Sequence, residues 1–217
     1  MKKTLMTVLA AGVLAVGIAT AGGFGQPAKG KDGTKEAAKA SGVKVGEDAP
    51  LFTLKDTDGK EHSLASLKGK VVVLFWFNAD CPFVVKHFKD TKTFNNIAAN
   101  YKDKNVVVMA INSNAPGTQG SGQKRNADAK KEWSMDYPIL LDESGETGKA
   151  YGARNTPACY VIGADGKVAY MGAIDDNPGE KVGETNYVTK ALDEILAGKK
   201  VTTAETKAYG CSVKYKK

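Results

Sequence analysis

The chain has 217 residues, 42% of them hydrophobic, and a formal net charge of +7. The excess of lysine and arginine is mild and spread along the chain without interleaved aromatic residues, so we expect no nucleic-acid partner. The three cysteines can form at most one internal bridge, which excludes a disulfide-stapled scaffold and favours a chemical role for the thiols.

The N-terminus predicts an export signal over residues 1–21. Two lysines precede an apolar run over residues 5–18, which a small-residue cleavage pattern follows. The run is short for a membrane span, although an uncleaved N-terminal anchor is the alternative. Residues 22–46, rich in Gly, Ala and Lys, predict a flexible tether. Residues 47–217 form the predicted domain, which we expect to be periplasmic or otherwise extracytoplasmic and soluble, without stable membrane insertion.

The patterning along the rest of the chain predicts an α/β domain. We expect strands at 49–54, 71–77, 105–111, 137–141, 158–162 and 167–171, and helical segments at 63–67, 81–101, 127–133, 146–151 and 190–196. Asp165-Gly166 indicates a hairpin between the last two strands. Strands that alternate with helices predict a central sheet covered on both faces, with right-handed crossovers.

Cys81 is the most informative single residue. It follows the apolar strand at 71–77 and opens the next helix, where first-turn N–H groups and the helix dipole favour an anionic sulfur. Pro82 suits the first helical turn, which needs no N–H partner. Val84 stands where a C-x-x-C dithiol would have its second cysteine. The sequence therefore predicts monothiol chemistry, in which any second sulfur comes from elsewhere.

Thr156-Pro157 precedes the strand at 158–162. A proline at the entry of a strand can be a simple strand terminus. Together with a cysteine at a strand–helix junction, it predicts a cis peptide bond beside the thiol, which is the active-site arrangement of the thioredoxin fold.

Four segments make the chain resemble the peroxiredoxin-like redoxins of the thioredoxin-fold superfamily, of the alkyl hydroperoxide reductase/thiol-specific antioxidant type. These segments are Asp80-Cys81-Pro82, Thr156-Pro157, residues 169–177 and residues 210–215. The resemblance covers the chain from about residue 46 onward. It implies a three-layer thioredoxin-like fold with a central mixed sheet flanked by helices, an N-terminal hairpin extension, a redox cysteine at Cys81 and a cis-proline at Pro157.

Two departures from related patterns limit what the resemblance implies. Peroxiredoxins have a proline and a threonine ahead of the reactive cysteine, in the pattern P-x-x-x-T-x-x-C. Leu74 and Asn78 occupy these positions here, and although Asn78 can still donate a hydrogen bond, the change weakens the case for efficient peroxidase activity. Thioredoxins proper have C-x-x-C, which Val84 interrupts.

Cys211 is the natural candidate for the missing sulfur. It lies in the tail after the last helix, and attack on an oxidised thiol needs access rather than proximity in sequence. We therefore expect a reversible Cys81–Cys211 bridge, with an exposed tail cysteine that pairs only by accident as the alternative. Cys159, on the strand after Pro157, is expected to be a small buried hydrophobe.

Other polar residues favour structural roles. His87 lies about 120° around the helix from Cys81, so a copper site of Cys81, His87 and Cys211 would require unwinding of the first turn. We expect His87 to be a surface or helix-packing residue and His62 to be an exposed loop residue. Asp175 and Asp176 lie in a Gly/Asn/Pro-containing loop that predicts a solvated turn.

The sequence thus predicts an exported thiol-disulfide oxidoreductase, with Cys81 as the nucleophile and possible resolution by Cys211. Asn78, Pro82, Thr156 and Pro157 are expected to form the groove around the sulfur, and no metal or other cofactor is expected. The expected partners are protein thiols and disulfides or a peroxide, and a thioredoxin-type reducing donor. The alternatives are a thiol peroxidase with Cys211 as the resolving cysteine, and a non-catalytic or copper-binding module.

Overall fold

The computed structural model describes residues 42–89 and 91–217. The predicted signal peptide and most of the predicted tether lie outside these residues. Val43 is buried, and the backbone N–H of Gly46 donates to the carbonyl of Val168 at 2.8 Å. Residues 42–46, the end of the predicted tether, therefore pack on the domain. No helix in the described part of the chain is both long and apolar enough to span a bilayer.

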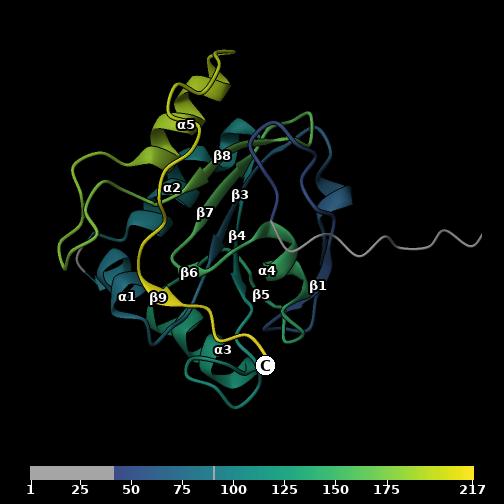
Figure 1. Ribbon diagram of the computed structural model, residues 1–217, viewed down its shortest axis with the longest axis vertical. Coiled ribbons are helices and arrows are strands. Elements are labelled where there is room, and N and C mark those ends of the chain that lie inside the picture. The colour runs from purple at the N-terminus through teal and green to yellow at the C-terminus, as the bar shows by residue number, and fades with distance from the viewer. Residues whose placement is uncertain (1–41, 90) are drawn as a thin grey trace, which may run out of the picture. The chain divides into compact units, whose positions relative to one another are not determined.

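The elements alternate largely as the patterning predicts (Figure 1). In chain order they are β1 (Thr53–Asp56), β2 (Glu61–Ser63), the 3₁₀ helix η1 (Leu64–Leu67), β3 (Val71–Trp76), α1 (Pro82–Lys89), α2 (Thr93–Tyr101), the 3₁₀ helix η2 (Lys102–Lys104), β4 (Val106–Asn112), α3 (Gln123–Glu132), β5 (Ile139–Leu141), α4 (Glu146–Tyr151), β6 (Asn155–Thr156), β7 (Cys159–Ile162), β8 (Val168–Gly172), α5 (Tyr187–Leu196) and β9 (Cys211–Ser212).

Seven strands form one mixed sheet in the order β2-β1-β5-β4-β3-β7-β8. Strands β3, β4 and β5 are parallel, and β7 pairs with β3 in the antiparallel direction. The β1–β2 hairpin joins the sheet through β5, so the expected N-terminal hairpin extension is present. Strands β6 and β9 form a separate two-stranded sheet.

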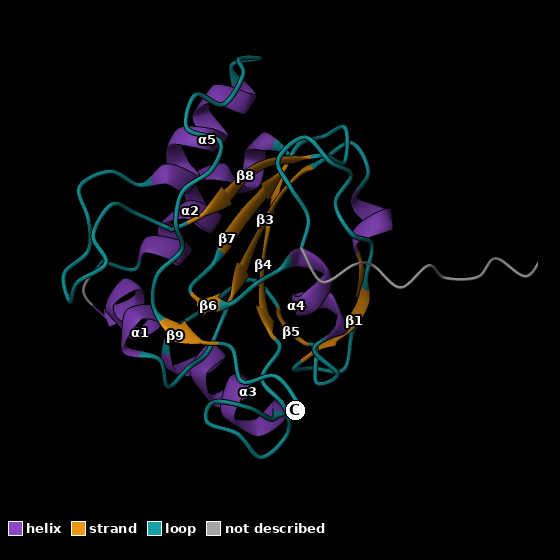
Figure 2. Ribbon diagram, in the orientation of Figure 1, coloured by secondary structure: helices purple, strands orange, loops and turns teal. Residues whose placement is uncertain are grey.

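Strand β3 supplies side chains to the cores on both faces of the sheet. All six of its residues are buried, and alternate residues point to opposite faces. Val73 and Phe75 pack in the core that includes residues of α1, α2, α3 and α5, whereas Leu74 and Trp76 pack in the core that includes Tyr151 of α4. Helices therefore cover both faces of the sheet, as Figure 2 shows.

The predicted helix over 81–101 is wrong in one respect, because it consists of two helices. α1 ends at Lys89 and α2 begins at Thr93, and Lys92 between them has a left-handed φ of 51°. A residue in this conformation cannot continue a right-handed helix. The first predicted strand is also displaced, since β1 begins at Thr53 rather than at residue 49.

Asp56 closes the β1–β2 hairpin with a buried carboxylate. Its Oδ1 accepts the backbone N–H groups of Asp58 at 2.9 Å and Lys60 at 3.0 Å, and its Oδ2 lies 2.7 Å from Nε2 of His62. His62 is thus a partly buried strand residue and not the exposed loop residue that was predicted. Burial would raise the pKa of Asp56, but these hydrogen bonds outweigh it and hold the pKa below 3.8.

Asp56→Asn should lower the free energy of unfolding at pH 7 by about 1 kcal/mol, because the charged acceptor facing His62 is lost. The folded pKa lies below the unfolded value, so this stabilisation is complete above the unfolded value and disappears as pH falls through the folded one. Urea denaturation of both proteins at pH 7 and at about pH 3 tests this. A difference in the free energy of unfolding between the two proteins that stays the same at the lower pH would contradict this role of Asp56.

Candidate active site

Cys81 lies in the connection between β3 and α1. Its backbone N–H donates to the carbonyl of Asn78 at 3.1 Å, and its own carbonyl accepts the N–H groups of Val84 and Val85, both at 2.9 Å. Pro82 is the first helical residue, as predicted. The rigid central strand therefore fixes the sulfur at the positive end of a helix dipole, where an anion is favoured.

The peptide bond between Thr156 and Pro157 is cis, which confirms the prediction for this pair. The thiol of Cys81 donates to the carbonyl oxygen of Thr156 at 3.1 Å. Thr156 is itself buried and ends strand β6. The cysteine at the helix start and the residue before the cis-proline are therefore in direct contact, although the sequence separates them widely.

Cys211 is the second sulfur at this site. Strand β9 pairs with β6 in the antiparallel direction, with Cys211 opposite Thr156 and Ser212 opposite Asn155 (Figure 1). Both cysteines are free thiols, and both contact Thr156, whose carbonyl accepts the Cys81 thiol and whose hydroxyl lies 3.4 Å from the carbonyl oxygen of Cys211. Burial, followed by the hydrogen bond to Cys81 and the charge of Cys81, raises the pKa of the Cys211 thiol to about 12.

The tail that carries Cys211 is anchored along its length. Backbone hydrogen bonds join Thr206 to the carbonyl of Met171 at 3.0 Å and Val213 to the carbonyl of Arg154 at 3.0 Å. Asn155 Nδ2 donates to the carbonyl of Gly210 at 3.0 Å. Cys81 is only 1% exposed beneath this tail. The expected bridge requires the tail to lie near Cys81, but no local pattern predicts these contacts, because they join the tail to backbone groups of distant segments.

Asn78 and the loop before α3 form a further side of the site. Asn78 is buried, and its Oδ1 accepts the backbone N–H of Asp80 at 2.9 Å. A Cβ on Gly120 would stand 1.8 Å from that Oδ1, so the loop packs directly on the asparagine. Arg125 of α3, for which no role was predicted, donates from Nε to Asp80 Oδ1 at 2.8 Å, and its Nη2 forms an ion pair with the same oxygen at 2.8 Å. The loop before α3 thus packs against the segment that carries Cys81.

Cys159 differs from the other two cysteines. It lies on β7 opposite Phe75 of β3 and is fully buried. Burial, and to a lesser extent the charge of Asp175, raises the pKa of its thiol far above the usual range. A thiol that stays protonated and has no solvent access is inert, in keeping with the expected structural role.

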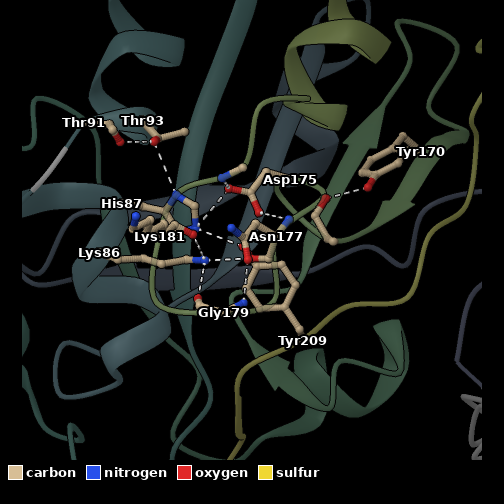
Figure 3. Close-up of polar contacts among 12 residues, drawn as sticks. Lys86, His87, Thr91, Thr93, Tyr170, Asp175, Asn177, Gly179, Lys181 and Tyr209 are labelled. Carbon is tan, nitrogen blue, oxygen red and sulfur yellow. Dashed lines mark hydrogen bonds and ion pairs between the residues drawn. The ribbon is translucent and has the colours of Figure 1, made fainter.

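Asp175 and His87 belong to a buried polar cluster that the sequence did not predict. Asp175 is 2% exposed, which contradicts the predicted solvated turn, and His87 is fully buried. The hydroxyl of Tyr209 donates to Asp175 Oδ1 at 2.5 Å and lies 3.1 Å from Nε2 of His87 (Figure 3). The buried carboxylate thus meets a tyrosine that lies two residues before Cys211.

His87 is engaged in this polar cluster from both ring nitrogens. Its Nδ1 lies 3.3 Å from the hydroxyl of Thr93, and its Nε2 faces Tyr209. Among the described residues, no group of three or more histidine, cysteine, aspartate or glutamate side chains is arranged to hold a metal ion. The copper alternative, which needs Cys81, His87 and Cys211 on one ion, therefore finds no preformed site in the part of the chain that is described.

The sheet with its flanking helices and the cysteine against a cis-proline loop define a thiol-based oxidoreductase of the thioredoxin fold. Residues 45–171 match the AhpC/TSA family, so the chain belongs to this family. The matched region contains Cys81, Cys159 and the cis-proline, whereas Cys211 and the tail lie beyond it.

Relatives of two kinds resemble this chain. The thiol-disulfide oxidoreductase ResA of Bacillus cereus is 28% identical, over 76% of this chain and 83% of its own length. Peroxiredoxin Q of Triticum aestivum is 30% identical, over 69% of this chain and 68% of its own length. An uncharacterized conserved protein from Geobacillus kaustophilus has a crystal structure with a TM-score of 0.73 and 31% identity, covering 80% of this chain and 93% of that one.

Gly210→Ala should uncover Cys81. Gly210 has a φ of 108°, and an added Cβ would stand 2.2 Å from the carbonyl oxygen of Thr156. Gly198→Ala is the matched control, because Gly198 has a φ of 69° but nothing within 4 Å of an added Cβ. Both variants incur the backbone strain, about 1 kcal/mol, but only Gly210→Ala should accelerate alkylation of Cys81, by about tenfold. Equal labelling rates in the two variants would contradict the tight docking of the tail.

Proposed function

We propose that this protein is an exported thiol-disulfide oxidoreductase in which Cys81 is the attacking thiolate and Cys211 completes the reaction. The observation that carries the proposal is that Thr156 brings the two cysteines together, because its carbonyl accepts the Cys81 thiol at 3.1 Å and Cys211 is its partner in the β6–β9 pairing. Two cysteines that share one neighbour in this way need little rearrangement to form a disulfide. The similarity to ResA supports the thiol-disulfide reaction as such, and the two-cysteine mechanism is our inference.

In the proposed reaction, the Cys81 thiolate attacks one sulfur of a substrate disulfide and displaces the other sulfur as a thiolate, which takes up a proton. The mixed disulfide between Cys81 and the substrate is then attacked by Cys211. This second step releases the remaining substrate thiol and leaves a Cys81–Cys211 disulfide. The substrate disulfide has then gained two electrons, and a thioredoxin-type dithiol donor returns them to the protein.

The electrostatics support Cys81 as the first cysteine to react and Cys211 as the second. The pKa of about 12 keeps Cys211 protonated at neutral pH while Cys81 is reduced, so Cys211 can donate its hydrogen to the Cys81 sulfur. In a mixed disulfide Cys81 can no longer bear a charge, so one cause of the raised pKa of Cys211 disappears. Cys211 then deprotonates more easily, at the step that needs its thiolate.

Each residue that lines the groove around the Cys81 sulfur has a distinct role. The carbonyl of Thr156 accepts the Cys81 hydrogen, and Pro157 fixes the direction of that carbonyl through its cis bond. Pro82 starts α1, and Asn78 holds the turn between β3 and α1 through the N–H of Asp80. We infer export from the charged, apolar and small-residue order of residues 1–21.

A thiol peroxidase is the second candidate, and the similarity to peroxiredoxin Q favours it. A peroxide would oxidise Cys81 to a sulfenic acid, and the Cys211 thiol would condense with it to a disulfide and water. Leu74 and Asn78 oppose efficient peroxide activation. Leu74 has no polar side-chain group, and the side-chain donor of Asn78, its Nδ2, already faces the carbonyl of Gln119 at 3.5 Å.

Cys81→Ser should reduce turnover of a model disulfide on the order of 10³-fold or more, because no other thiol occupies the helix start. Cys159→Ser, the matched control, should retain turnover. Cys211→Ser should carry out the first step and accumulate the mixed disulfide, which intact-mass measurement detects. Failure of a stable mixed disulfide to accumulate in Cys211→Ser would remove Cys211 from the mechanism.

Oxidation of the purified, reduced protein separates the two candidate activities. Fast formation of a Cys81–Cys211 bridge by hydrogen peroxide, mapped on peptides, would favour the peroxidase. Slow oxidation by peroxide with rapid exchange against a model disulfide would favour the oxidoreductase.

A further inference from the structure

A buried polar cluster joins the tail to the helix that starts at Cys81. We call Tyr209, Asp175 and His87 the tyrosine latch (Figure 3). Tyr209 lies in the tail, Asp175 in the loop after β8, and His87 on α1. Besides the two contacts of the Tyr209 hydroxyl, Asp175 Oδ2 lies 3.9 Å from His87 Nε2. The latch therefore bridges three segments that are distant in sequence.

The aromatic ring of Tyr209 has contacts of its own, which do not involve the hydroxyl. Lys86 is almost fully buried, and its Nζ donates to the carbonyls of Asn177, Gly179 and Lys181 at 2.8, 2.9 and 2.9 Å. The same Nζ lies 4.7 Å from the centroid of the Tyr209 ring, and the ring of Phe83 lies edge-on at 6.1 Å. The aromatic ring is thus held by two residues of α1, while the hydroxyl reaches Asp175 and His87.

The hydroxyl of Tyr209 is one of the hydrogen-bond donors to the buried carboxylate of Asp175. A buried carboxylate needs donors, and Asp175 has the backbone N–H groups of Asn177 at 3.1 Å and Gly183 at 2.7 Å in addition to the phenol. Burial and the bond to Asp175 raise the pKa of Tyr209 far above the usual range, so the phenol remains a hydrogen donor. Loss of this donor would weaken the attachment of the tail to the body of the domain.

We propose that Tyr209 is a positioning residue that holds the tail closed over Cys81. The inference rests on the proposed function, because it concerns the same pair of cysteines. Tyr209 lies two residues before Cys211, and its partner His87 lies on the helix that begins beside Cys81. The closed latch therefore places Cys211 against Cys81, and at the same time shields Cys81 from a large substrate.

This arrangement requires different tail positions for the two half-reactions. Attack on a protein disulfide needs an accessible Cys81, and hence an open latch. Closure of the Cys81–Cys211 bridge needs the two sulfurs in contact, and hence a closed latch. Loss of the Tyr209 hydroxyl should therefore make Cys81 more accessible to a large reagent and should make the Cys81–Cys211 disulfide less stable.

The test compares Tyr209→Phe with Tyr101→Phe. Tyr101 also donates its hydroxyl to an aspartate, Asp193, at 2.5 Å, but this bond joins α2 to α5 and not the tail to α1. In a Cys211→Ser background, a bulky maleimide should label Cys81 about tenfold faster in Tyr209→Phe, and at the unchanged rate in Tyr101→Phe. The buried Cys159 is an internal control, since general loosening of the fold would accelerate its labelling as well. An unchanged Cys81 rate, or an equal rise at Cys159, would overturn the proposal.

A second measurement uses the chain with all three cysteines. The equilibrium between the Cys81–Cys211 bridge and glutathione should shift toward the reduced protein by about tenfold in Tyr209→Phe, and should stay unchanged in Tyr101→Phe. If the wild-type chain forms no bridge at all while Tyr209→Phe still exposes Cys81, the latch stands and the two-cysteine mechanism fails. A bridge of undiminished stability in Tyr209→Phe would overturn the positioning role.

Discussion

The pairing of β9 with β6 is the constraint on which the site depends. Two residues of the tail align with the two residues that precede the cis-proline, and this alignment sets Cys211 opposite Thr156. The carbonyl of Thr156 also receives the Cys81 thiol, so one short strand contacts both cysteines. A shift of one residue in this pairing would turn Cys211 to the opposite side of its strand. The identity of the residue at position 210 matters for the same reason, because a side chain there would collide with that carbonyl.

The three cysteines show how environment, and not residue type, separates structure from chemistry. Cys159 is surrounded by the core on a central strand and has neither access nor a charge-stabilising partner. Cys81 is almost equally buried, but it stands at a helix start with a carbonyl and a second thiol beside it. In the mechanism that we propose, movement of the tail uncovers Cys81, whereas Cys159 stays in the core.

Local patterns were sufficient to predict the features that local sequence determines. The buried strand that ends near Cys81, the helix start at Pro82 and the proline after Thr156 all carry a signal within a few residues. Cys211 was a candidate for the second sulfur only because the chain has no C-x-x-C motif. No local pattern predicts its pairing with β6. The predicted exposure of Asp175 was wrong because a loop rich in Gly, Asn and Pro is typical of a solvated turn. Its burial depends on Tyr209 and His87, which come from distant parts of the chain.

The position of the tail in the sequence also affects how the protein matures. Because the chain is made from its N-terminus, the strands and helices that bury Cys159 emerge before the segment that covers Cys81. During synthesis the groove beside the cis-proline is therefore vacant for a period, with the thiol at the helix start uncovered. In that interval the nascent protein is open to unwanted pairing with other cysteines. Completion of residues 209–213 ends this exposure, so the segment that covers Cys81 is made after the groove that it covers.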